Sequence, residues 1–358
     1  MSKILLILMV FLGQRAYSEP YVFLAGSREY ANGDYAVIGA SDVVVSTGNI
    51  FQELAADAVK KGKDRTAADY GEIGDYLVDG LHNRLFVWNG VPDESYSGVL
   101  VLRLSDRTYL DSISVSALWG GKVLLVDKAG NVLYTGYDDE DMAQTYVYDA
   151  KDYHDIYPEP LRSDLRSACL FGDDKIYQLG EIYQESDVIH KRFRLIGDLT
   201  PLQRTDISCA DNVVVLYSRE KSKYALEIWD LQTATRSVVI PLEGNTNDSL
   251  YQWQLTPDAK YLVYADRINP LGYHSAALIR TPHIKVYSVS DGKMVASGDI
   301  SKIIGETQSF DKFFMGFSVS GQEMVFYSEN MLYVLDVKTL KLQHKVRIPD
   351  APDKVIWP

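Results

Sequence analysis

Cysteine is scarce in this sequence, and its scarcity excludes several kinds of site. The 358 residues include only Cys169 and Cys209. Two thiols are too few for a structural zinc site or for the disulfide framework of a small secreted domain. The two cysteines lie forty residues apart, at like places before two successive predicted strands. Two interpretations follow: a disulfide between adjacent repeats, or two buried small hydrophobic side chains.

Basic residues are the minority among the charged ones. The chain has 36 Lys and Arg against 49 Asp and Glu, a formal net charge of −13. Nucleic-acid binding needs clustered Lys and Arg, so we expect no nucleic-acid partner. General solubility is the simpler explanation for the acidity.

No hydrophobic run is long enough to cross a bilayer comfortably. The apolar segment Ile4–Gly13 has ten residues, about half the length that a spanning helix needs. Lys3 precedes it, and Ala16-Tyr17-Ser18 follows with small residues at the −3 and −1 positions of a cleavage site. We therefore predict a signal peptide over 1–18, no membrane span, and a periplasmic or secreted protein with one domain over 19–358.

The usual catalytic signatures are missing as well. The sequence contains no Gly-x-Ser-x-Gly, His-Glu-x-x-His, Cys-x-x-Cys or Gly-x-Gly-x-x-Gly motif. We therefore assign no catalytic residue, no metal ligand and no cofactor. Any catalysis would have to come from residues dispersed over the chain.

What the sequence does contain is a repeated turn and strand. In the clearest copy, Thr256-Pro257-Asp258 predicts a turn before the short strand Tyr261–Tyr264. Six other segments resemble this strand, and we predict that each is the second strand of a repeat: 35–38, 84–88, 122–126, 175–179, 212–217 and 323–327.

A second recurring unit is a strand that ends in a polar turn and is followed by another strand. It occurs at 99–106, 225–233, 284–292 and 332–339, with a weaker copy at 146–149. Four short strands in each forty-odd residues are typical of a β-propeller blade. We predict an all-β, seven-bladed propeller, with six or eight blades as alternatives. Closure of its ring would pair the strand 21–24 with the C-terminal residues 354–357.

One segment departs from the β pattern. Phe51, Leu54, Ala55 and Val59 lie on one helical face, and Gly62 suits the end of a helix. We predict a short helical insertion near residues 51–62.

The turn motifs resemble those of a known superfamily. Leu-Thr-Pro-Asp-Ala-Lys-Tyr-Leu-Val-Tyr at 255–264 resembles the Ser-Pro-Asp-Gly-Lys turn of exported YVTN and Tol-type propellers, which are WD-repeat-like. Residues 317–327 resemble a degenerate copy, and Asp-Leu-Gln-Thr at 230–233 resembles a third-to-fourth strand turn of these families. The chain differs in having Ala259 at the usual glycine. The resemblance implies a propeller; related folds serve as the large non-catalytic chain of quinoprotein amine dehydrogenases, as scaffolds, and sometimes as lyases or hydrolases.

The longest predicted loop, 265–283, holds most of the candidate site residues. It would join a second to a third strand near the channel mouth, and unusually long loops often carry function. We expect a second long loop, 181–192, on the same face. The candidates for ligand binding, in which a histidine could serve as a ligand or general base, are Arg267, Tyr273, His274, Arg280, His283 and His190. The alternative is a loop that only packs over the face, with solvated arginines.

Two function classes fit these features. The first is a binding or assembly module whose partner is another protein, contacted through the face with the long loops. The alternative is an enzyme or enzyme subunit, quinoprotein dehydrogenase-like, a lyase or a hydrolase. Its site at the channel mouth would use Arg267, His274, Arg280 and His283.

Overall fold

The chain is almost entirely β-structure. The computed structural model describes residues 20–24, 33–70, 72–90, 98–114, 119–137, 143–157, 160, 168–171, 175–178, 181–184, 195–198, 207–220, 223–242, 249–268, 283–306, 314–328, 330–349 and 352–357. These residues form 27 strands and three short helical segments, α1 (Ile50–Lys60), η1 (Ala67–Tyr70) and α3 (Ile300–Ile304). No helix among them is long and apolar enough to cross a membrane. The predicted signal peptide lies outside the described residues.

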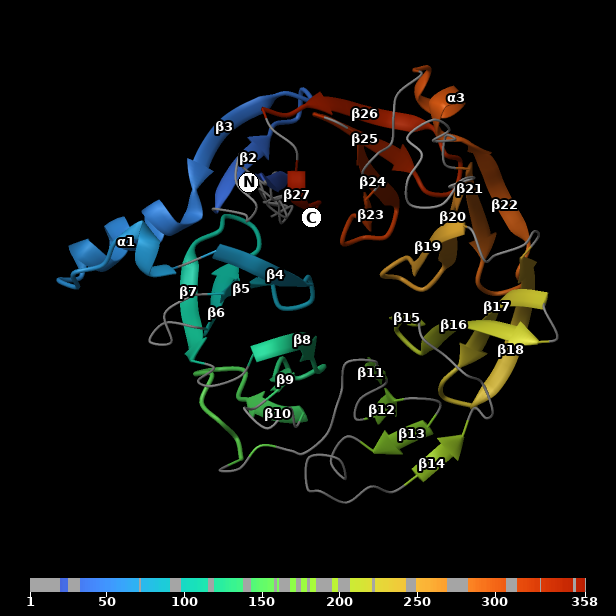
Figure 1. The fold of residues 1–358 in the computed structure, drawn as a ribbon, viewed down its shortest axis with the longest axis horizontal. Coiled ribbons are helices and arrows are strands. Elements are labelled where there is room, and N and C mark those ends of the chain that lie inside the picture. Colours follow the sequence, from blue (N-terminus) through green and yellow to red (C-terminus); the bar gives the residue numbers. More distant parts are fainter. Residues whose placement is uncertain are drawn as a thin grey trace, which may run out of the picture.

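The strands form seven antiparallel sheets, which stand in a ring around a common axis (Figure 1). Sheet 1 contains β27 (Pro352–Ile356), β1 (Tyr21–Leu24), β2 (Asp34–Ile38) and β3 (Val44–Asn49). Sheet 2 contains β4 (Glu72–Asp79), β5 (Arg84–Gly90), β6 (Gly98–Arg103) and β7 (Tyr109–Ser114), and sheet 3 contains β8 (Trp119–Val126), β9 (Val132–Tyr137) and β10 (Ala143–Tyr148). Sheet 4 contains β11 (Ala168–Phe171), β12 (Lys175–Gln178), β13 (Glu181–Gln184) and β14 (Leu195–Asp198). Sheet 5 contains β15 (Ile207–Ala210), β16 (Val213–Glu220), β17 (Lys223–Asp230) and β18 (Thr235–Leu242). Sheet 6 contains β19 (Ser249–Leu255), β20 (Tyr261–Ile268), β21 (His283–Ser288) and β22 (Met294–Asp299), and sheet 7 contains β23 (Phe314–Phe317), β24 (Glu323–Ser328), β25 (Met331–Asp336) and β26 (Leu342–Arg347). The first strand of each sheet faces the axis and the last lies at the outer rim (Figure 1).

Among the described residues, six of the seven sheets are complete four-stranded blades of a β-propeller, so six complete blades are found where seven were predicted. Sheet 3 has three strands in the described residues. At the place of its fourth strand, Asp155 makes a single bridge to Tyr148. Pro158 and Pro160 follow in the sequence, and proline cannot donate to a strand ladder. Two predicted second strands were also placed wrongly, because residues 122–126 lie in the first strand β8 and residues 35–38 form the third strand β2.

The two ends of the chain close the ring, as predicted. β1 pairs with β27, with Tyr21 opposite Ile356 and Val22 opposite Val355. Trp357 continues beyond this strand, and its indole Nε1 donates to Glu323 Oε2 of sheet 7 at 2.7 Å. The residues near the C-terminus therefore hold sheet 1 to sheet 7.

Each inner strand buries both of its faces. In β5, Leu85 and Val87 pack in the cluster shared with sheet 1, whereas Phe86 packs in the cluster shared with sheet 3. All three side chains are fully buried. Runs of consecutive apolar residues thus form strands here because every sheet lies between two others.

Tight turns gather at one end of the strands, which we call the turn face. It carries the first-to-second and the third-to-fourth strand turns, and in sheet 5 these two are tied by a bond from Leu231 N to Asn212 O of 2.8 Å. The equivalent bond in sheet 6 joins Val289 N to Lys260 O at 3.0 Å. The second-to-third strand connections and the segments that join consecutive sheets lie at the opposite end, which we call the loop face.

The turn at residues 256–261 has the predicted form. Thr256 is fully buried, and its hydroxyl accepts from Tyr261 N at 3.0 Å and contacts Asp258 Oδ1 at 2.7 Å. Ala259 has a left-handed φ of 54°, and Gly321, at the equivalent place in sheet 7, has a φ of 71°. The glycine that exported propellers have at this place is therefore explained by backbone geometry.

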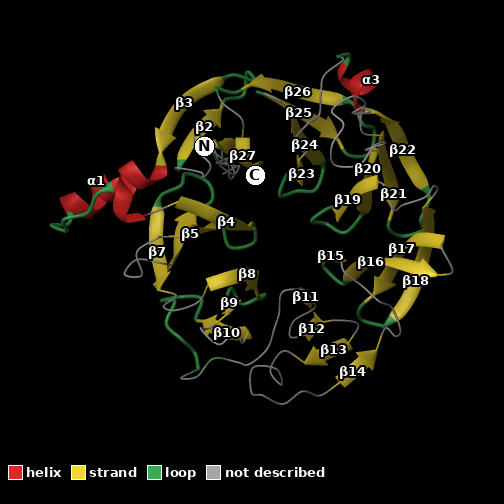
Figure 2. Cartoon of the chain, viewed as in Figure 1, coloured by secondary structure: helices red, strands yellow, loops and turns green. Residues whose placement is uncertain are grey.

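The predicted helical insertion is α1, which leaves the rim after β3 (Figure 2). Asn49 caps it by accepting from Gln52 N at 3.0 Å. Ile50, Phe51 and Leu54 are buried with the alanines at 55 and 58. Val59 is 57% exposed, contrary to the prediction, because 100° per residue places it at the edge of this face. The five-residue helix α3 was not predicted, since a single turn leaves too little periodicity to detect.

Candidate functional site

Most of the predicted site residues cannot be placed together. Tyr273, His274, Arg280 and His190 lie outside the described residues. For Arg267, the backbone position is known: it lies in β20, opposite Leu250 of β19. The strands also extend further into the predicted loop than expected, since β20 ends at Ile268.

His283 is the one predicted site residue whose side chain is described. It is the first residue of the third strand β21, and its Nδ1 lies 2.8 Å from Asp299 Oδ1 on the outer strand β22. The Nζ of Lys302 binds the second carboxylate oxygen at 2.8 Å. The hydrogen bonds from His283 and Lys302 hold the pKa of Asp299 below its usual range. The imidazole is therefore held toward the rim, not toward the first strand beside the axis.

The strand order corrects the bounds of the second predicted loop. Residues 181–184 form the third strand β13, and β14 follows it as the fourth strand of sheet 4. His190 lies outside the described residues, and the placement of both long loops on one face stays a prediction.

The two cysteines form a link between neighbouring sheets. A disulfide joins Cys169 of β11 to Cys209 of β15, with their Cα atoms 6.1 Å apart. Both strands are the first of their sheets, and Cys169 is buried. The bridge thus fastens sheet 4 to sheet 5 on the side of the axis.

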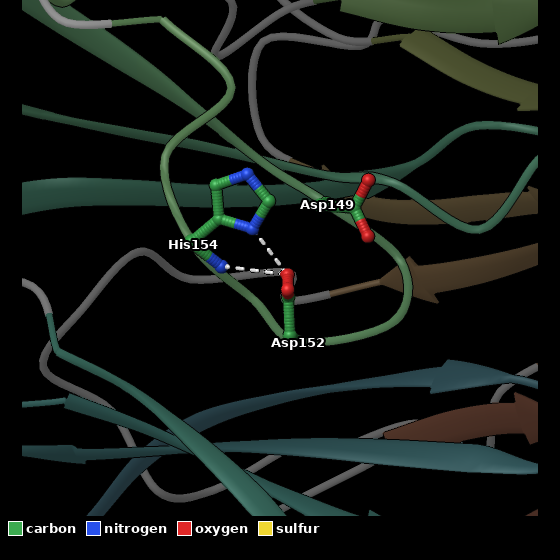
Figure 3. Close-up of side chains that lie close together, drawn as sticks. All are labelled: Asp149, Asp152 and His154. Carbon is green, nitrogen blue, oxygen red and sulfur yellow. Dashed lines mark hydrogen bonds and ion pairs between the residues drawn. The ribbon is translucent and has the colours of Figure 1, made fainter.

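Among the described residues, one group could in principle hold a metal ion. Asp149, Asp152 and His154 follow β10 on the turn face, with potential ligand atoms within 4.8 Å of one another (Figure 3). His154 Nδ1 contacts Asp152 Oδ1, and this hydrogen bond raises the pKa of His154 and lowers that of Asp152. Asp149 Oδ1 accepts from Lys151 N at 2.8 Å. Both carboxylates accept hydrogen bonds from residues of the same turn. Asp152 and His154 are also exposed, as in an ordinary solvated turn.

Exposed apolar side chains follow the outer rim. Eight of the ten large apolar residues that are exposed in the described part of the chain lie in a fourth strand or at its place. They are Val43, Val45, Leu110, Ile156, Val239, Met294, Val295 and Leu342. Single exposed apolar residues are normal, but edge strands usually carry charge where they meet solvent.

Six of these residues lie in or next to the outer strands of sheets that contact each other near the rim. Val43, Val45 and Leu342 flank the ion pair between His344 Nδ1 of sheet 7 and Asp42 Oδ1 of sheet 1, 2.7 Å long; we call them rim patch 1.

We give the name rim patch 2 to the exposed residues of the outer strands of sheets 5 and 6, Val239, Met294 and Val295. There Gly292 approaches Val238 so closely that a Cβ on the glycine would lie 2.3 Å from Val238 Cγ1. Rim residues of neighbouring sheets are therefore close enough to form shared surfaces.

Sequence reasoning missed the rim, although one signal was present. Val43-Val44-Val45 is a run of three valines in the sequence. In a strand that is buried on both faces such a run is expected, but in an outermost strand it must expose apolar side chains. Recognising the run as an outer strand required the correct assignment of strands within sheet 1.

Comparison with known proteins finds similar chains only among solved structures. No protein-family model matches the sequence, and no curated protein matches it significantly. Among solved structures, the chain is similar to Hsv2p of Kluyveromyces lactis, with 13% identity and a TM-score of 0.48 over 74% of each chain. It is also similar to the dihydro-heme d1 dehydrogenase NirN, with 13% identity and a TM-score of 0.46 over 93% of this chain and 64% of that one. A third similar structure is the β-propeller domain of Cps50 (Swd1) from Myceliophteria thermophila, with 13% identity and a TM-score of 0.41 over 79% of this chain and 88% of that one. Likeness at this level concerns the fold, and it does not separate YVTN or quinoprotein propellers from other WD40-like ones.

Proposed function

We propose that this chain is an exported β-propeller that binds another protein as an interaction or assembly module. The observation that carries the proposal is the concentration of exposed apolar side chains on the outer strands. Apolar side chains grouped on a surface often mark a site where a partner excludes water. The signal-like segment 1–18 supports export, and the turn at 255–264 resembles those of YVTN and Tol-type propellers.

The alternative is an enzyme, and one observation favours keeping it. His283 is oriented by Asp299 at the base of the segment that holds His274 and Arg280. A histidine held by a carboxylate is a common element of general-base catalysis. The described contacts explain the same pair as a surface ion pair, because Lys302 also binds Asp299.

Co-purification from the native extract tests the proposal. The bait is the tagged chain, compared with a variant that charges both rim patches, Val45→Lys/Val295→Lys. Gln232→Lys/Gln322→Lys is the matched control, since both glutamines are exposed and lie in turns away from the patches. We expect the wild type and the control to retain one partner protein and the rim variant to lose it.

Two results would contradict the proposal. Equal retention by all three baits would show that the rim is not the binding surface. Turnover by the isolated wild-type chain, with no retained partner, would favour the enzyme, and replacing His283 should then abolish that turnover.

A further inference from the structure

The fourth strand of sheet 1 differs in charge from the other fourth strands in the described residues. β3 reads Val-Val-Ser-Thr-Gly-Asn and contains no charged side chain. The other described fourth strands each carry at least one: Asp111 in β7, Asp198 in β14, Arg236 in β18, Asp299 in β22, and Lys345 and Arg347 in β26. Charge on an edge strand discourages pairing with another chain, and β3 has none.

The side chains of β3 also suit a strand partner. Val45 lies in β3 and Val43 directly precedes the strand, and the two valines are 53% and 51% exposed. β3 is the last strand of its sheet in the described residues, so its backbone faces outward along one side. An added strand would continue the sheet and cover both valines.

Cations lie beyond the end of β3. α1 begins directly after this strand and extends outward from the ring (Figure 1). The segment Lys60-Lys61-Gly62-Lys63-Asp64-Arg65 at its far end carries four positive charges against one negative, in a chain whose net charge is −13. Lys61 Nζ is bonded to Asp57 Oδ2 at 2.6 Å, while Lys60 and Lys63 are exposed.

We propose that the outer edge of β3 takes an extended segment of the partner protein as an added antiparallel strand, with acidic residues of that segment at the cationic end of α1. This inference rests on the proposed protein-binding function and names the binding edge and the chemistry of the partner. Main-chain hydrogen bonds supply affinity in such strand addition, and side-chain pockets and charges supply specificity. The antiparallel direction is chosen because all pairs in the seven sheets are antiparallel and this ladder is the more stable.

The direction fixes where the acidic residues belong. The C-terminal end of β3 adjoins α1, so an antiparallel partner strand has its N-terminal end there. The 11 residues of α1 span about 16 Å at the rise of a helix, which an extended chain covers with about five residues. The partner segment should therefore carry its acidic residues about five positions before the strand.

A pair of synthetic peptides of identical composition tests this geometry. The first is Asp-Asp-Asp-Gly-Ser-Gly-Ser-Gly-Thr-Val-Thr-Val-Thr, and the second has the same residues in reverse order. Binding of each labelled peptide to the full chain is followed by fluorescence anisotropy at low and high salt. We expect the first peptide to bind more tightly, with the difference disappearing at high salt because the charges are exposed. Amide exchange of the β3 backbone should slow when it is bound.

Paired variants separate the two parts of the site. Val45→Lys should weaken binding of the first peptide at least about tenfold, since it charges the edge, and Val295→Lys on β22 should not. If Val45→Lys lowers the unfolding midpoint, Val43→Lys replaces it as the variant that adds a charge at this edge.

Lys60→Glu/Lys63→Glu should weaken binding about threefold to tenfold at low salt. The matched reversal Lys338→Glu/Lys341→Glu, at exposed positions of sheet 7, should leave it unchanged.

The outcomes distinguish this inference from the proposed function. No binding at millimolar peptide, equal binding of the two peptides at low salt, or unchanged exchange at β3 would overturn strand addition. If rim-dependent capture of a partner persists in that case, the protein-binding function stands and only the named edge is wrong. If capture fails, the proposed function itself is wrong, whatever the peptides do.

Discussion

Breaking the Cys169–Cys209 disulfide should lower the free energy of unfolding by about 4 kcal/mol. The two cysteines are 40 residues apart in sequence, so the bridge closes a loop of that size in the unfolded chain. The entropy that such a loop removes from the unfolded state grows with the logarithm of its length, which gives about 4 kcal/mol at 25 °C. In the folded state the bridge joins β11 and β15, whose sheets otherwise meet through side-chain packing.

Urea unfolding with and without a thiol-free reductant measures this effect. The reduced wild type should unfold at the same urea concentration as Cys169→Ala/Cys209→Ala in oxidising buffer, apart from the small packing loss of the alanines. The double variant should not respond to the reductant, which controls for effects of the reagent itself. Circular dichroism and tryptophan fluorescence should give coincident transitions, since the free energy is defined only for a two-state process.

Two results would refute the reasoning. One is an identical transition for oxidised and reduced wild type, which would mean that the bridge does not constrain the unfolded chain. The other is a count of two free thiols in the unfolded, unreduced protein, which would mean that the bridge does not form.

Three further changes have expected outcomes. Ala259→Gly should raise the free energy of unfolding by about 1 kcal/mol, because it removes a left-handed non-glycine residue; Gly321→Ala should lower it, because its Cβ would lie 3.0 Å from Asp258 Oδ1, and urea titrations compare the two. Arg84→Met should lower the free energy of unfolding by about 3–5 kcal/mol, since the buried Asp79 carboxylate loses bonds from Nε and Nη2; an unchanged urea midpoint would show that the pair is not buried in solution. In an NMR titration, His154 should have a pKa above its usual value, and Asp152→Asn should return it, because the Asp152 carboxylate favours the imidazolium. That pair stabilises the fold at pH below the ordinary histidine pKa and loses this effect as pH rises through the raised one, so a His154 pKa insensitive to Asp152→Asn would contradict the contact.

Much of the fold could be predicted because local rules and the global architecture agree here. Asp336 illustrates this agreement, since its Oδ1 accepts from Thr339 N at 2.7 Å in a turn that the sequence motif identified. The pairing of Tyr21 with Ile356 followed from the need to close a ring. The prediction of seven complete blades failed at sheet 3, where residues 122–126 were counted as a second strand but lie in the first strand β8. A strand motif identifies a strand, but the number of partners it finds depends on residues far along the chain.

The candidate site was less accessible to sequence reasoning, for a physical reason. A long loop between two strands can be recognised locally, but its face depends on which strands it joins. Residues 181–184 were assigned to a loop with His190, whereas they form the third strand β13. His283 similarly looked like a loop residue, whereas its place in β21 pairs it with Asp299.

Ring closure was expected to remove exposed sheet edges, and it does so only near the axis. Pairing of β1 with β27 covers the edges at the chain ends, but every sheet still ends in an outer strand at the rim. Most of these strands carry charges that discourage a second chain, and β18 also contains Pro241. β3 lacks both devices and instead presents exposed valines. Each rim strand of a propeller needs its own charge or proline to prevent pairing with another chain. A rim strand that lacks both is therefore the expected place for a binding edge. This reasoning directs the search for a partner to β3 before the loop face.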